Sequence, residues 1–155
     1  MKYSSEEHEA TRRSVEELFR EVASRFPHAT MRTDVPGPGR EGLIELSCSL
    51  PGTTHVRALP GADQIDLYLG EATWLELMPS RRKPSKLLDS VREVVEAVVA
   101  GRFEERVREV RGKTIGAKST VHRPDRKAIV WRYTRLSSNA LFRGNRRTIR
   151  YKPYG

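Results

Sequence analysis

The sequence predicts an α+β fold in which a single antiparallel sheet of six to seven strands, which can be strongly curved, carries two helices on one face. Several short segments alternate apolar and polar residues with period two, which is typical of half-buried strands. Two longer segments repeat apolar residues every three or four positions, which is typical of amphipathic helices. Along the chain the predicted order is one helix, four strands, a second helix and three strands.

The two predicted helices span about residues 5–25 and about 85–101, or slightly beyond. The apolar stripe of the first helix consists of Val15, Leu18, Phe19, Val22 and Phe26, and Pro27 ends the helix. The second has a continuous stripe over 87–99, and Gly101 favours an end near that residue. Residues 102–111 fit either a helix or a strand, and we favour a strand that runs into Val110.

Residues 43–79 are predicted to form an antiparallel meander. Its clearest part is a hairpin over 64–78, in which the alternation pairs Leu67 with Leu75 and leaves a three-residue loop, 70–72. The same register places Tyr68 opposite Trp74 on the other face. Residues 31–42 contain two Pro-Gly steps and are expected to be a surface loop.

The C-terminal third, 105–152, is predicted to form basic strands, with frayed residues after Lys152. The net charge of +9 arises here, because residues 111–155 contain thirteen Lys or Arg and one acid, Asp125, and so carry +12, whereas the rest of the chain carries −3. The alternation places cations on the faces turned away from the core. The candidate binding residues are Lys118, His122, Arg132, Arg135, Arg146, Arg150 and Lys152, and the candidate aromatic anchors are Tyr68, Trp74, Trp131 and Tyr133.

Length and composition favour a single domain over residues 1–155. There is one cysteine, Cys48, so no disulfide framework is possible within the chain. The N-terminus is polar and no window reaches transmembrane length, so the expected location is the cytoplasm, with no membrane partner.

No catalytic, metal-binding or cofactor-binding motif is found. The four histidines are far apart, and neither H-E-x-x-H nor G-x-S-x-G occurs. The segment GPGREG, 37–42, lacks the spacing of a phosphate loop. We therefore expect no catalytic residue, no metal and no cofactor, and we favour a protein that is not an enzyme, with an enzymatic cup kept as an alternative.

Three functions remain open. The first is a binding module whose basic sheet face meets an acidic partner protein. The second is a nucleic-acid-binding protein that uses the same cations and aromatic side chains. The third is a small-ligand or enzymatic cup between the sheet and the helices, near Tyr68, Trp74 and Trp131.

The order of elements is similar to that of some bacterial secretion chaperones and toxin-immunity proteins, although no residue motif carries the likeness. The sequence leaves the oligomeric state open, a homodimer included.

Overall fold

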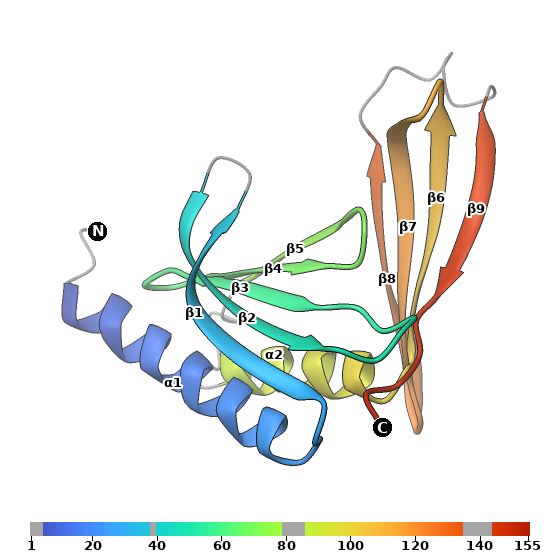
Figure 1. Cartoon of the computed structure of the whole chain (residues 1–155). Helices are drawn as coiled ribbons and strands as arrows, with labels where there is room; N and C mark the ends of the chain where they lie inside the picture. Colours follow the sequence, from blue (N-terminus) through green and yellow to red (C-terminus); the bar gives the residue numbers. More distant parts are fainter. Residues whose placement is uncertain (1–4, 38–39, 79–85, 135–143) are drawn as a thin grey trace.

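The computed structural model describes residues 5–37, 40–78, 86–134 and 144–155. Its strands form two antiparallel sheets, ordered β1-β2-β3-β4-β5 and β8-β7-β6-β9 (Figure 1). The elements are, in chain order, α1 (Ser5–Ser24), β1 (Ala29–Gly37), β2 (Arg40–Cys48), β3 (Val56–Pro60), β4 (Ile65–Leu69), β5 (Thr73–Leu77), α2 (Lys86–Val99), β6 (Phe103–Val110), β7 (Lys113–Arg123), β8 (Arg126–Thr134) and β9 (Asn145–Arg150).

The core lies between the first sheet and the two helices, which cover the same face of that sheet (Figure 1). Along the strands of the first sheet, alternate side chains point into this core, where they meet the apolar stripes of both helices. Burying each large side chain contributes roughly 1.5–3 kcal/mol. Fully or nearly fully buried members include Val15, Leu18, Phe19, Ile44, Leu46, Val56, Leu67, Leu69, Leu75, Val94, Val95 and Val98.

The prediction of one sheet of six to seven strands is wrong, because the second sheet stands upright against the end of the first (Figure 1). After β5 the chain crosses under the first sheet as α2, and β6 then pairs with β7 on one side and β9 on the other. The strands of the second sheet therefore do not pair with β5. The second sheet joins the core through Phe103 and Val121 at its base.

The base of the second sheet is fixed by a helix cap and by the C-terminal tail. Gly101 ends α2 with a φ of 70°, and the Gly101 and Arg102 N–H groups donate to the carbonyls of Val98 and Ala97 at 3.0 and 2.8 Å. This is the Schellman arrangement. The prediction that residues after Lys152 fray is wrong, since Tyr154 is fully buried and donates its hydroxyl to the Thr54 carbonyl at 2.6 Å.

The prediction of a loop over 31–42 is also wrong in its described part, which belongs to the β1–β2 hairpin. Pro36 is accommodated because β1 is an edge strand, where a residue without an N–H breaks no ladder. The pairing shifts twice between Arg32 and Gly37, with Asp34 at a φ of 54°. Arg12 of α1 holds this region through Asp34 and the Gly42 carbonyl, at 2.9 and 3.0 Å.

Several local predictions are confirmed. Leu67 pairs with Leu75 and Tyr68 with Trp74, and the loop between the strands is 70–72. Both helices lie within a few residues of their predicted bounds, and residues 103–110 form a strand. None of the described helices combines the length and apolarity that crossing a membrane requires.

Candidate functional site: two charged sheet faces

The outer face of the second sheet, turned away from the core, carries a row of cations. Arg132 on β8 lies opposite Lys118 on β7, and Lys118 lies opposite Arg106 on β6. Residues directly opposed in antiparallel strands share a face, with Cβ atoms about 4.5–5.5 Å apart. Three positive charges therefore stand next to one another across three strands.

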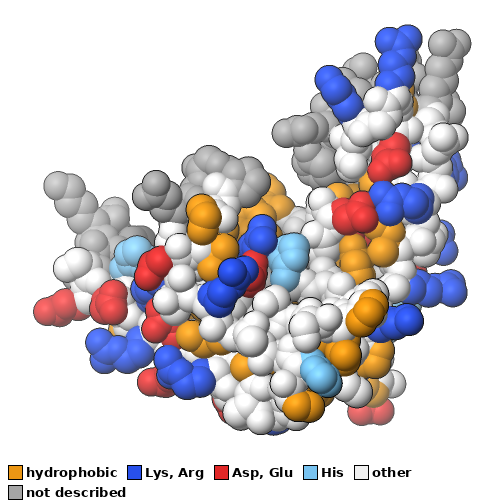
Figure 2. All heavy atoms as spheres, in the orientation of Figure 1, with side chains coloured by type: hydrophobic (Ala, Val, Ile, Leu, Met, Phe, Trp, Pro, Cys, Tyr) orange, Lys and Arg blue, Asp and Glu red, His pale blue; other side chains and the backbone are white. Residues whose placement is uncertain are grey.

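Further cations extend this row along the sheet. On β9, Arg146 lies opposite Arg108 and Arg150 lies opposite Glu104. Glu104 is the single acid on this face among the described strand residues, and it lies 3.5 Å from Arg150 and 3.9 Å from His122. Lys and Arg side chains are visible along this side of the upright sheet (Figure 2). We define the outer basic face as Arg106, Arg108, Lys118, Arg132, Arg146 and Arg150.

The structure brings most of the predicted cations together. Lys118, His122, Arg132, Arg146 and Arg150 lie on the outer side of the second sheet. Lys152 does not, because it follows β9 and its N–H donates to the Gly52 carbonyl at 2.8 Å in the β2–β3 turn. Arg135 lies outside the described residues. Sequence reasoning missed Arg106 and Arg108, although their alternation with the buried Val107 was a usable signal.

The predicted aromatic anchors lie elsewhere. Trp131 is opposite Ser119, which is opposite Glu105, so it is on the inner face and packs against the core. In the backbone register Tyr133 is opposite Ala117 on the same strands. Tyr68 and Trp74 belong to the first sheet. The outer basic face instead combines its cations with Thr120, Val130 and Thr148.

The helix-free face of the first sheet has a charged row of a different kind. It consists of one residue from each strand, in the order Arg32, Glu45, Arg57, Tyr68 and Trp74. The Glu45 carboxylate is only 2% exposed and accepts hydrogen bonds from both arginines, including Arg57 Nε at 2.6 Å. Burial acts to raise the pKa of Glu45, but the two arginines outweigh it and lower that pKa.

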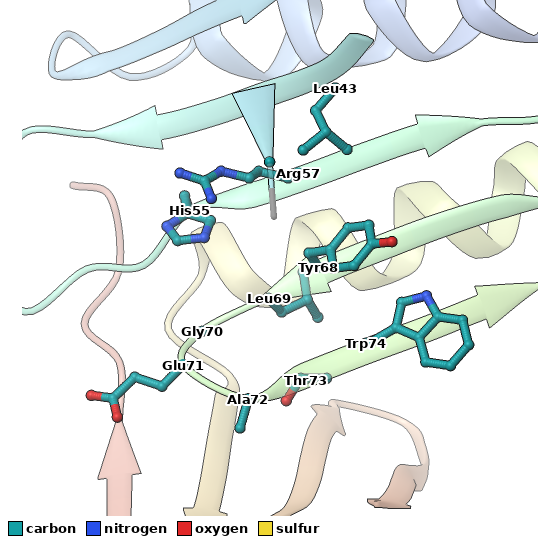
Figure 3. A pocket seen from close by; sticks show the side chains of 11 residues that line it. Leu43, His55, Arg57, Tyr68, Leu69, Gly70, Glu71, Ala72, Thr73 and Trp74 are labelled. Atoms are coloured by element: carbon teal, nitrogen blue, oxygen red, sulfur yellow. The ribbon is translucent and has the colours of Figure 1, made fainter. Parts of the chain in front are cut away.

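A hollow of about 320 Å³ opens on this helix-free face, beside the turn between β4 and β5 (Figure 3). Its walls include Leu43, His55, Arg57, Tyr68 and Trp74. Burial, followed by the charge of Arg57, lowers the pKa of His55 and so favours its neutral imidazole. The predicted cup between the sheet and the helices is replaced by packed core, and the hollow lies on the opposite face of the sheet.

Sequence reasoning also missed Glu105, a fully buried carboxylate on the inner face of β6. It accepts hydrogen bonds from the N–H groups of Glu71 and Ala72 at 2.9 and 3.1 Å, and from Tyr151 Oη at 2.6 Å. Thr73 Oγ1 is a further donor. Glu105 thereby binds the β4–β5 turn to the second sheet, and its hydrogen-bonding capacity is used within the fold. The usable signal was its spacing: Glu105 lies two residues from both Phe103 and Val107, so strand alternation places its carboxylate on the same face as these two apolar side chains.

The described residues contain no group of three His, Cys, Asp or Glu side chains that could hold a metal ion. No protein-family model matches the chain, and no curated protein or solved structure shows significant similarity to it. Function must therefore be inferred from the two charged faces.

Proposed function

We propose that this protein is a non-enzymatic binding module whose outer basic face engages an acidic surface of a partner protein. The supporting observation is the row formed by Arg106, Lys118 and Arg132. Like charges directly opposed across strands destabilise a sheet. An acidic partner offsets that repulsion and accepts charge-assisted hydrogen bonds from the guanidinium groups.

The placement of the aromatic side chains favours a protein partner over a nucleic acid. Proteins that bind single strands stack bases on aromatic side chains that lie among their cations. Trp131 is on the opposite face of the sheet from Lys118 and Arg132. The side chains between the cations are Thr and Val, with Val130 44% exposed, and this mixture suits a protein interface with an apolar centre.

The test measures binding of a fluorescent polyglutamate peptide by anisotropy, with a DNA duplex and an oligothymidine of similar charge for comparison. We expect the triple variant R106A/K118A/R132A to bind polyglutamate at least about tenfold more weakly than the unmodified protein. Affinity for polyglutamate should also fall as salt is raised, because the groups are exposed.

A matched control separates a specific face from overall charge. The triple variant R13A/R20A/K86A removes the same charge from exposed helix positions and should keep its affinity within about twofold. Equal losses in the two triple variants would reduce the effect to net charge and overturn the proposal. Tighter binding of either nucleic acid, lost only in R106A/K118A/R132A, would replace the acidic protein with a nucleic acid.

A further inference from the structure

The hollow on the helix-free face of the first sheet combines a cation, two aromatic rings and an apolar wall. Arg57, Tyr68 and Trp74 come from three successive strands and lie directly opposite one another in the register. Strands in a sheet are about 4.8 Å apart, so the row from Arg57 to Trp74 covers about 10 Å. Leu43 lines the same hollow (Figure 3).

The charge balance of this row leaves room for one negative charge. Arg32 and Arg57 share the single carboxylate of Glu45. Arg57 donates to Glu45 through Nε, whereas a guanidinium has five N–H donors. Glu71, also in the wall of the hollow, is already held by Arg147 at 2.7 Å. A ligand with one carboxylate would give the second arginine of this row an anionic partner of its own.

We propose that this hollow binds a small aromatic carboxylate, whose carboxylate pairs with Arg57 and whose ring lies against Tyr68 and Trp74. A volume of about 320 Å³ is at the low end of small-molecule sites, which limits the ligand to one or two rings. Aromatic rings gain more on Tyr and Trp than their buried area alone provides, and this favours an aromatic over an aliphatic acid. The inference is independent of the outer basic face.

The test titrates ¹⁵N-labelled protein with 2-naphthoate and follows the indole N–H signals of its two tryptophans, Trp74 and Trp131. We expect the Trp74 signal to shift with saturation and the Trp131 signal to stay in place. Neutral 2-naphthamide, of nearly the same shape, should bind at least about tenfold more weakly because it cannot pair with Arg57 as an ion. The variant W74L identifies the two signals and should also weaken binding.

Two arginine variants form a matched pair, because each leaves Glu45 with one arginine. R57Q should weaken naphthoate binding at least about tenfold, while R32Q, which removes the same charge but no N–H donor from the walls of the hollow, should weaken it by about threefold or less. Equal effects of R57Q and R32Q would overturn the proposal. So would equal affinity for naphthoate and naphthamide, or an unshifted Trp74 signal at millimolar naphthoate, and these two outcomes need only the unmodified protein.

Discussion

The two sheets handle charge in opposite ways. In the first sheet the row Arg32–Glu45–Arg57 alternates in sign, and its carboxylate is buried and satisfied. In the second sheet, the row Arg132–Lys118–Arg106 repeats one sign. Opposed unlike charges stabilise a strand pair by roughly 0.2–1 kcal/mol, and like charges destabilise it by a similar amount. The first row thus stabilises the fold, whereas the second reduces its stability.

This difference separates structural charge from charge that is open to a partner. Glu45 and Glu105 are both nearly or fully buried, and each already receives several hydrogen bonds from the chain itself. Arg150, by contrast, keeps 80% of its side chain exposed even beside Glu104. A carboxylate that the fold has satisfied has little left for a ligand, so binding is better sought at cations that keep N–H donors, on the outer basic face and at Arg57.

The largest expected effect comes from breaking the contact between the two sheets. The variant E105A removes the acceptor of two backbone N–H groups, of Tyr151 and of Thr73, and should lower the free energy of unfolding by about 4 kcal/mol. Urea denaturation measures this loss. The variant E104A changes the next residue, on the opposite face, and should cost less than about 1 kcal/mol. A loss for E105A no larger than that for E104A would show that Glu105 does not hold the sheets together.

A smaller effect is expected within the first sheet. The variant E45A leaves Arg32 and Arg57 unpaired and repelling each other, and should cost about 2 kcal/mol, since both arginines can regain water. The variant E76A, at an exposed position on β5, should stay within about 0.5 kcal/mol. The same urea titrations measure both. If E45A cost no more than E76A, the alternating row would contribute nothing to stability.

The sequence predicted what depends on neighbours along the chain. The alternation from Ile65 to Leu77 determines both the hairpin register and the pairing of Tyr68 with Trp74, because a slip of one residue would turn every leucine to solvent. The same reasoning placed Lys118 and Arg132 on one face. These predictions needed only the period of a strand and the length of one loop.

The number of sheets could not be predicted in this way, because it depends on which edges meet. β9 pairs with β6 rather than with its predecessor β8, and α2 carries the chain away from the edge of β5. The role of Glu105 becomes evident only when the turn at 70–72 is placed against it. Gly70 illustrates the closeness of that contact, because a Cβ there would lie 2.3 Å from the Glu105 carboxylate. Single-sequence periodicity carries no information on such contacts.

The row of like charges in the second sheet predicts a variant that gains stability instead of losing it. The variant K118E places an acid between Arg106 and Arg132 and should stabilise the isolated protein by about 1 kcal/mol while it weakens polyglutamate binding. High salt should reduce the gain, since exposed pairs are screened. The variant K113E makes the same change of charge on the same strand, at an exposed position that lies opposite Val110 rather than opposite a cation. A stability gain equal to that of K118E would point to net charge rather than to the row.

The smallest expected effect is the pH dependence that His55 confers on the first sheet. Burial and Arg57 lower its pKa below 6.5, against the weaker opposite influence of Glu45 and Glu105. Well above pH 6.5 the imidazole is neutral in both states. As pH falls from 6.5 toward the lowered pKa, the unfolded chain binds a proton that the folded chain does not bind, so the free energy of unfolding decreases.

The variant H55Q should flatten that decline between pH 7 and 5 in urea titrations, whereas H8Q, at an exposed position on α1, should leave it unchanged. An identical decline in H55Q and in the unmodified protein would mean that the imidazole beside Arg57 is as easily protonated as one in water, and that the hollow is more open to solvent than its walls indicate.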